Sequence, residues 1–226
     1  MSETRPTLRE SLSKTAARAS SRGLREVAGE RWRQLQEAVR SDGALKLMTR
    51  AVGGEPPGDD LRFTLATPAD AEAYARDIGT DSAATFRRRL SPTTDCCLVR
   101  SDDTILHASW LTTSRAWTSE IKAFLAPPQG DAYIYESFTR SEARGRGVYP
   151  FALLSICHEL GLRGLSQAWV AVEVGNQPSI RAITKAGFSE GFEIRFRRRG
   201  GRVLIDPPAG PLAETATGFI SGRNGD

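Results

Sequence analysis

The stretch RSEARGRGVYP, from Arg140 to Pro150, alternates arginine with glycine and runs directly into FALLSICHELG, whose apolar spacing is helical. Glycine carries no Cβ, so the main chain of such a loop can approach a ligand closely. Amides at the start of a helix lack intrahelical partners and carry partial positive charge. The pattern is therefore typical of an anion site, most often for a phosphate. Arginine–glycine pairs also occur in exposed turns, and the loop alone does not choose between the two interpretations.

The segments on either side of the loop give it a context. DAYIYESFT, Asp131–Thr139, alternates as a strand does. VEVGNQPSIRAITKAGF, residues 172–188, reads as a strand end followed by a short helix that Gly187 stops. The loop itself matches neither GxxxxGK[ST] nor GxGxxG, which argues against a P-loop and against a dinucleotide-binding fold.

The remaining elements after residue 60 predict a mixed sheet with helices on its faces. Thr67 can cap a helix over 67–79, in which Pro68 suits the first position and Asp70 can bond back to the cap. Another helix is expected at 82–90. Its arginines, Arg87 to Arg89, are interpreted as a solvated rim, with steering of an anionic ligand as the alternative. Segment 118–125 is ambiguous, and strands are predicted at 61–66, 95–101, 103–111, 131–139, 166–174, 191–199 and 202–208. The strands at 95–101 and 103–111 are expected to form a hairpin, and the last two strands another.

The breaker cluster GGEPPGDD is the best candidate for a domain boundary. It separates a basic helical extension, residues 1–52, from the main domain at 61–206, with 53–60 as the linker. The tail at 207–226, rich in glycine, proline, alanine and threonine, is expected to be flexible.

Charge and composition limit the classes of function. Residues 1–50 hold eleven Lys/Arg against six Asp/Glu, +5, which leaves −1 for the rest of a chain whose net charge is +4. These charges interleave along predicted helices, which is more typical of a solvated face than of a nucleic-acid surface. The sequence contains no apolar run of membrane-spanning length and no signal core, so we expect a cytoplasmic protein without membrane contact. Three cysteines without a CxxC pattern and two histidines without an HxxxH pattern argue against a metal site.

The order and spacing of the two motifs resemble the GNAT superfamily of acyl-CoA-dependent N-acetyltransferases. One family signature, a [QR]-x-x-G-x-[GA] loop after the fourth strand, corresponds to Arg144, Gly147 and Tyr149. The other signature consists of a strand, an Asn and a helix that ends in K-x-G-F. Here it corresponds to Asn176 and the run ending at Phe188. The resemblance covers residues 61–206. It implies an α/β (α+β) GNAT fold: a mixed central sheet of about six to seven strands with helices on both faces, plus the N-terminal helical extension.

The resemblance also implies acetyl-CoA as co-substrate, bound where the fourth and fifth strands separate, with no metal. The diphosphate would rest on the loop amides, and the pantetheine arm would pair with the end of the preceding strand. The residues that it assigns to the coenzyme are Phe138, Thr139, Arg144, Gly145, Arg146, Gly147, Val148, Tyr149, Asn176 and Ser179.

Two positions depart from the family pattern. Tyr149 stands where the loop signature has Gly or Ala, which puts the loop geometry in question. Many family members carry, four residues before the Gly of K-x-G-F, a Tyr that protonates the departing thiolate; here the residue is Ile183. A thiol has a pKa near 8.5, so water or another group could supply that proton.

Acylation of an amine needs a base, because an alkylammonium has a pKa near 10.4. Glu136, on the strand that receives the thioester, is the candidate base, with pairing to an arginine as the alternative. Strand alternation places it with Ile134 and Phe138, and places Tyr133, Tyr135 and Ser137 on the other face. Tyr135 is the candidate for a substitute acid, with packing as the alternative. His107 could also be a base, although a lone histidine in an apolar strand is more often a satisfied core residue.

Three further residues are candidates for the acceptor site. Trp110 and Trp117 flank a turn where family members commonly build that pocket, and they could line it or simply pack. Glu173 could bind the amine or form an ion pair.

The function that the resemblance favours is transfer of an acetyl group to a primary amine, with a small molecule ahead of a protein N-terminus or lysine. A non-catalytic acyl-CoA-binding module is the rival, and the sequence leaves a homodimer open.

Overall fold

The computed structural model describes residues 42–55, 57–58, 61–199 and 202–221. An eight-stranded sheet organises this part of the chain, in the order β10-β9-β1-β8-β7-β4-β3-β2, and its neighbours are antiparallel except for the parallel pair β7–β8. Its strands are β1 Asp42–Ala51, β2 Arg62–Leu65, β3 Thr94–Ser101, β4 Thr104–Thr112, β7 Ala132–Thr139, β8 Gln167–Glu173, β9 Ser189–Arg199 and β10 Arg202–Ile205.

Five α-helices and a small second sheet complete the described residues. The helices are α3 Ala71–Asp77, α4 Ala83–Arg89, α5 Val148–Leu162, α6 Gln177–Lys185 and α7 Ala216–Phe219, and the small antiparallel sheet consists of β5 Ala116–Thr118, β6 Ala123–Leu125 and β11 Ile220–Ser221. Short 3-10 turns lie at Pro68–Asp70, Ser141–Ala143 and Ala213–Thr215. No helix among the described residues combines the length and the apolar character that a membrane span needs.

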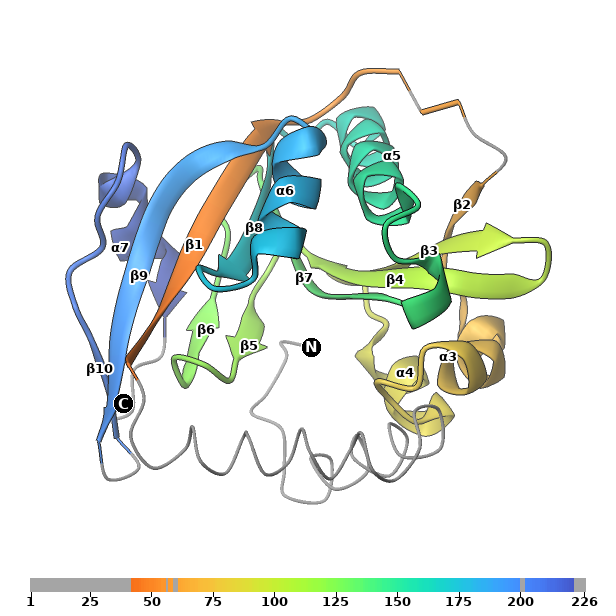
Figure 1. Ribbon diagram of the computed structural model, residues 1–226, viewed down its shortest axis with the longest axis horizontal. Coiled ribbons are helices and arrows are strands. Elements are labelled where there is room, and N and C mark those ends of the chain that lie inside the picture. The colour runs from red at the N-terminus through yellow and green to blue at the C-terminus, as the bar shows by residue number, and fades with distance from the viewer. Residues whose placement is uncertain (1–41, 56, 59–60, 200–201, 222–226) are drawn as a thin grey trace.

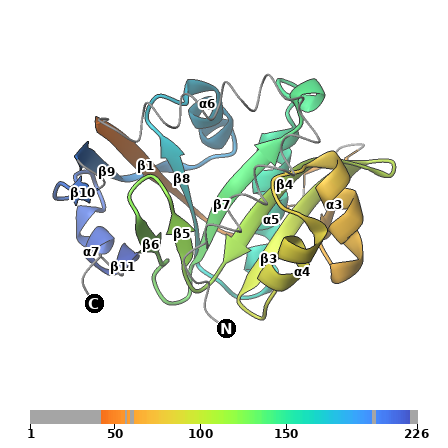
Figure 2. The ribbon, with the colours of Figure 1, turned by 90° about the horizontal axis from the view of Figure 1, so that it is seen from below.

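Two apolar layers sandwich the large sheet (Figure 1). One layer, which includes Ile134, Val170 and Ile156, lies between the sheet and the helices α5 and α6. The other, which includes Tyr74, Trp110 and other aromatic side chains, lies beneath α3, α4 and the small sheet. Figure 2 shows α6 and the small sheet on opposite sides of the large sheet. The sheet is therefore covered on both faces, as predicted.

Local capping signals account for several helix starts. Thr67 and Asp70 form the predicted capping box, with Pro68 in the first position. The hydroxyl of Ser82 caps α4 by accepting a hydrogen bond from the Thr85 amide at 3.2 Å. The predicted β3–β4 and β9–β10 hairpins are present.

The strand β1 is the main correction to the fold predicted from sequence. The prediction of about six to seven strands was too low, because Asp42–Ala51 had been assigned to the helical extension. This segment instead pairs antiparallel with both β8 and β9, in the interior of the sheet. Its Leu45 and Leu47 side chains enter the aromatic layer. The helix predicted for the preceding residues, 1–41, lies outside the described residues.

The C-terminal segment is the second correction. The residues after 206 were predicted to be a flexible tail, but β11 pairs with β6, and the Phe219 side chain is fully buried. Phe219 meets Tyr133, Trp169 and Phe192 at ring-centroid distances of 5.2–5.8 Å. Aromatic packing orders this segment despite its glycine- and proline-rich composition.

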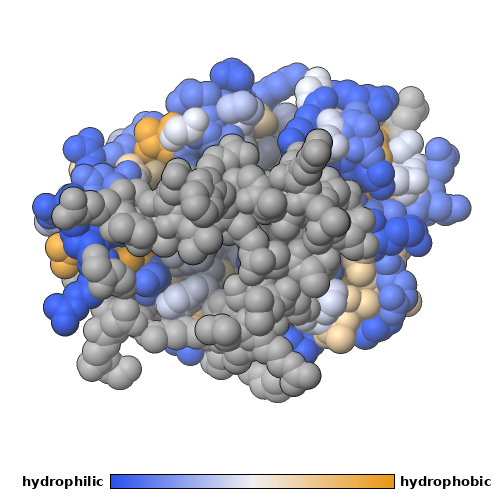
Figure 3. Space-filling view, turned by 60° about the horizontal axis from the view of Figure 1, so that its bottom comes forward, coloured by the Kyte–Doolittle hydropathy of each residue, from blue (hydrophilic) through white to orange (hydrophobic). Residues whose placement is uncertain are grey.

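The surface view agrees with a layered fold whose apolar residues are mostly inside. On the part of Figure 3 that is not grey, hydrophobic residues form small separated groups among hydrophilic ones. Among the described residues, the exposed large hydrophobic side chains are Leu162, Leu204 and Leu212.

Candidate coenzyme pocket and the adjoining sheet face

The parallel strands β7 and β8 separate partway along their length. Their pairing ends at Ile134 opposite Val170, although β7 continues to Thr139 and β8 to Glu173. On its other side β7 stays paired with β4 as far as Thr139 opposite His107. Beyond Ile134, the edge of β7 that faces β8 therefore has no strand partner among the described residues. Such an edge can accept an extended ligand as an added strand.

A β-bulge lies at the point of separation. Trp110 of β4 pairs with Tyr135 and Ala108 pairs with Phe138, so that Glu136 and Ser137 together oppose Ser109 alone. Glu136 adopts a left-handed conformation, φ 46°. The bulge interrupts the alternation of side chains along the strand.

The predicted faces of β7 were consequently wrong beyond the bulge. Phe138 packs against the aromatic layer that contains Tyr133 and Tyr135, not the layer that contains Ile134. Ser137 points into the pocket on the helix side, where Ser109 lies within hydrogen-bond distance of it.

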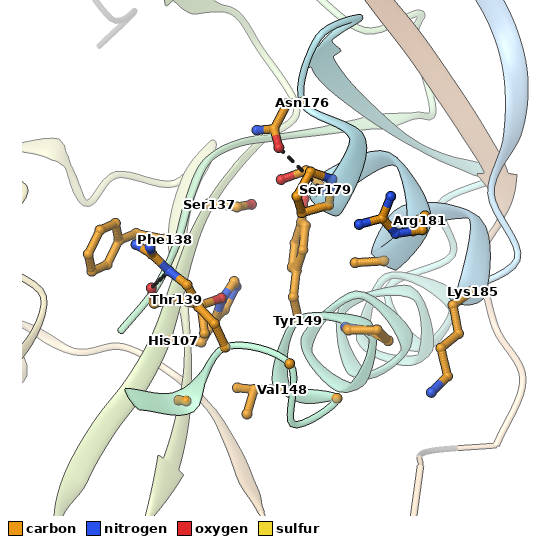
Figure 4. A pocket seen from close by; sticks show the side chains of 17 residues that line it. His107, Ser137, Phe138, Thr139, Val148, Tyr149, Asn176, Ser179, Arg181 and Lys185 are labelled. Atoms are coloured by element: carbon orange, nitrogen blue, oxygen red, sulfur yellow. Dashed lines mark hydrogen bonds between the residues drawn. The ribbon is translucent and has the colours of Figure 1, made fainter. Parts of the chain in front are cut away.

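A pocket of about 670 Å³ lies at this separation, between the end of β7, the start of α5 and α6 (Figure 4). The residues that line it are His107, Ser137, Phe138, Thr139, Ala143, Arg144, Gly145, Gly147, Val148, Tyr149, Pro150, Asn176, Pro178, Ser179, Arg181, Ala182 and Lys185. The volume falls in the range of cofactor-sized sites. Of the residues that the family resemblance assigned to the coenzyme, all but Arg146 line this pocket, and Arg146 is exposed.

The loop between β7 and α5 presents main-chain amides to the pocket. Gly145 and Gly147 have φ angles of 75° and 80°, which suit glycine, and Gly147 is the N-cap of α5. Among the described residues, none of the amides from Gly145 to Tyr149 donates a hydrogen bond, and Pro150 has no amide hydrogen to satisfy. A Cβ added at either glycine would meet no atom within 4 Å. These amides are free to bind an anion.

Cationic side chains line the same pocket. Arg144 donates from Nε to the main-chain oxygen of Thr139 at 3.1 Å, which ties the loop to the end of β7. Arg181 and Lys185 project from α6 (Figure 4). Neither residue is among the predicted coenzyme residues, although their four-residue spacing on the predicted helix places them on one face.

Asn176 and Ser179 connect β8 to α6 at the rim of the pocket. Asn176 is the N-cap of α6, and its Oδ1 accepts a hydrogen bond from the Ser179 amide at 3.2 Å. The cap holds the Asn176 side chain against the first turn of α6.

His107 is fully buried beneath the pocket, and hydroxyl groups flank both of its ring nitrogens. Nδ1 lies 2.7 Å from Thr139 Oγ1, and Nε2 lies 2.7 Å from Ser109 Oγ. Burial lowers the pKa of the imidazole to about 3, so the ring is neutral near pH 7. The ring stacks on Tyr149 at 5.1 Å between centroids.

Tyr149 points from the first turn of α5 into the pocket, between β7 and α6 in the view of Figure 4. Burial raises the pKa of its hydroxyl to about 12, and a hydrogen bond with Ser137 acts in the opposite direction. A side chain at the last loop position is therefore accommodated, and the loop keeps its glycine conformations.

On the opposite face of the sheet, the bulge brings Glu136 to Arg89. The Arg89 side chain is only 10% exposed and donates from Nη1 to Glu136 Oε2 at 2.7 Å and to the buried Asp81. Burial disfavours the charged guanidinium, but the carboxylates of Glu136 and Asp81 outweigh it and raise the pKa of Arg89 well above its ordinary value. The prediction that Arg89 belongs to a solvated rim was therefore wrong.

The aromatic residues proposed for the acceptor site have other surroundings. Trp110 is fully buried, donates from Nε1 to the Tyr74 hydroxyl at 3.1 Å, and has the Arg89 guanidinium 3.9 Å above its ring. This burial leaves no surface of Trp110 for an acceptor, which corrects its assignment. Trp117 lies in β5 and packs edge-on against Phe124.

The candidate acid Tyr135 and the candidate acceptor residue Glu173 also lie outside the pocket lining. Tyr135 is buried and stacks on Tyr133 at 5.7 Å. Glu173 is exposed at the end of β8. The structure thus brings together the predicted coenzyme residues, but not the predicted acceptor residues.

The chain is similar to known proteins in its structure, while its sequence gives no match. No protein-family model matches the sequence, and no curated protein matches it. A GCN5-related N-acetyltransferase from Sphaerobacter thermophilus superposes with a TM-score of 0.51 at 15% identity, over 78% of this chain and 58% of that one. A GCN5-related N-acetyltransferase from Kribbella flavida gives a TM-score of 0.50 at 16% identity, over 87% and 68%. In three of the matched structures the aligned part spans 57% to 63% of their length.

Proposed function

From the GNAT fold that this chain adopts, we propose that it is an acyl-CoA-dependent N-acetyltransferase that transfers an acetyl group from acetyl-CoA to a primary amine. One observation carries the proposal: among the described residues, loop amides that donate no hydrogen bond and the end of β7 from which β8 diverges border the same pocket. CoA needs both features, because it joins a charged diphosphate to an extended amide-containing arm.

The chemistry of the lining fits CoA. The amides from Gly145 to Tyr149 would hold the diphosphate, and Arg144, Arg181 and Lys185 supply positive charge around it. The edge of β7 from which β8 diverges beyond Ile134 would pair with the pantetheine arm.

Glu136 would accept a proton from the acceptor amine. Its carboxylate lies on the bulge where β7 leaves β8, with its side chain 39% exposed. Arg89 holds it at 2.7 Å, which favours the ionised form that a base requires. A thioester supplies the activated acetyl group, and main-chain amides of β7 beyond Ile134 would donate to the developing oxyanion.

The acceptor class remains a primary amine. The preference for a small molecule depended on an aromatic pocket around Trp110, and that residue lies in the core. Small amines and peptide amines therefore belong in the same screen.

The test has two stages. Calorimetry with CoA should show binding, and acetyl-CoA consumption should increase with at least one amine class. Glu136→Gln should retain CoA affinity and lose transfer. Absence of CoA binding to folded protein would refute the proposal.

Ile183 favours a second candidate, a non-catalytic acyl-CoA-binding module. Its side chain is fully buried and cannot donate a proton. CoA binding without transfer to any amine in the screen would support this alternative.

A further inference from the structure

Two cationic side chains of α6 lie on the wall of the pocket opposite β7. Figure 4 shows Arg181 and Lys185 on one side of the pocket, and Phe138 and Thr139 of β7 on the other side. Lys185 follows Arg181 by four residues, so both side chains lie on the same face of the helix. Both are exposed, and a ligand in the pocket can therefore reach them.

No carboxylate balances these two charges. The described lining of the pocket contains no aspartate or glutamate, and neither does α6 itself. Within the part of the chain that the structure describes, Arg181 and Lys185 have no ion-pair or hydrogen-bond partner. Like charges four residues apart on a helix repel each other. A bound anion would remove that repulsion.

CoA carries two separate anionic groups, and the loop before α5 accounts for only one of them. The amides from Gly145 to Tyr149 are proposed to hold the diphosphate, and the Arg144 guanidinium is tied to the β7 side of the pocket through Thr139. The diphosphate joins the pantetheine arm to the adenosine. An arm that follows β7 therefore leaves the adenosine on the other side, toward α6. The adenosine carries the 3′-phosphate, a monoester with a charge of about −1.5 to −2 at pH 7.

On the basis of the proposed function, we propose that Arg181 and Lys185 form a subsite for this phosphate monoester, so that the protein selects CoA over dephospho-CoA. A guanidinium presents paired N–H donors that match phosphate oxygens, and an ammonium adds a compact charge beside them. Formal charge on α6 binds the monoester, whereas main-chain amides at the start of α5 bind the diphosphate. The subsite sets the affinity for the coenzyme and takes no part in the chemistry of acetyl transfer.

Titration calorimetry with CoA and with dephospho-CoA measures this selection, and it needs no acceptor amine. The two ligands differ only in the 3′-phosphate, so the ratio of their dissociation constants isolates the contacts of that group. The unmodified protein should bind CoA about 10- to 100-fold more tightly than dephospho-CoA, as expected for hydrogen bonds between charged groups. In a variant that combines Arg181→Gln with Lys185→Gln, the difference should fall below about threefold.

Matched variants separate the subsite from the general effect of a lost charge. Arg202→Gln removes one positive charge at an exposed position of β10, outside the pocket lining, and should leave the ratio unchanged. Lys185→Arg keeps the charge and should keep most of the selection, whereas Lys185→Gln should lower the ratio by about 3- to 10-fold. Glutamine is a good helix former, so the α6 variants should fold, which thermal unfolding checks.

The outcomes are distinguishable. Failure of the unmodified protein to bind CoA would refute the proposed function itself, and this inference with it. Equal affinities of the unmodified protein for CoA and dephospho-CoA would refute only the inference. An unchanged ratio in the double variant would also overturn it, because the selection would then come from residues other than Arg181 and Lys185.

Discussion

Replacing Gly147 by aspartate would put a carboxylate at the N-cap of α5, where the diphosphate of CoA is proposed to bind. The new Cβ meets no atom within 4 Å, so the substitution causes no clash. The backbone cost is about 1 kcal/mol, because φ is 80° and aspartate tolerates the left-handed region better than most residues. Two like charges about 5 Å apart at an effective dielectric constant of about 20 repel by roughly 3 kcal/mol. Affinity for CoA should therefore fall by at least about 100-fold.

Gly147→Asn is the matched control, since it has nearly the same shape and backbone preference but no charge. Titration calorimetry of both variants with CoA, at low and high salt, separates charge from shape because salt weakens the repulsion. Thermal unfolding should give both variants similar midpoints. Equal CoA affinities for the Asp and Asn variants would refute the placement of the diphosphate at this helix start.

Three further predictions concern the base, the buried histidine and the C-terminal segment. Glu136→Gln should lower acetyl transfer by about 10²- to 10⁴-fold, measured as acetyl-CoA consumption, and unchanged transfer would exclude Glu136 as the base. Because the folded-state pKa of His107 lies below its unfolded value, the unfolded state binds the extra proton, and stability should fall as pH drops from about 6.5 toward 3. The slope is about 1.4 kcal/mol per pH unit; urea unfolding between pH 6.5 and 5 should show it, and His107→Gln should remove it. Phe219→Ala should cost about 3–5 kcal/mol in the free energy of unfolding, also measured with urea, and a cost below about 1 kcal/mol would contradict the packing of this segment.

Local sequence signals were sufficient to predict the elements around the candidate coenzyme pocket. Glycines with free backbone choice and a following apolar period act over a few residues, and they predicted the loop and the start of α5. The capping box at Thr67 and the β3–β4 hairpin were predicted from equally short patterns.

Sequence spacing did not reveal the bulge at Glu136. Two residues of β7 oppose one residue of β4 there, and only the pairing of the two strands defines that mismatch. The bulge turns Ser137 toward the pocket and Glu136 toward Arg89, so it determines both the contact of Ser137 with Ser109 beneath the pocket and the surroundings of the proposed base.

The sequence by itself was sufficient to predict a glycine-rich loop that leads into a helix, and most of the strands and helices after residue 60, because their signals are local. Tertiary structure alone decided that Asp42–Ala51 is an interior strand, that Phe219 is buried, and that Arg89 is held between two carboxylates. The physical reason is the same in each case. These residues gain their stabilising partners only when segments far apart in the chain come together, and an amphipathic or arginine-rich segment carries no local signal that identifies those partners.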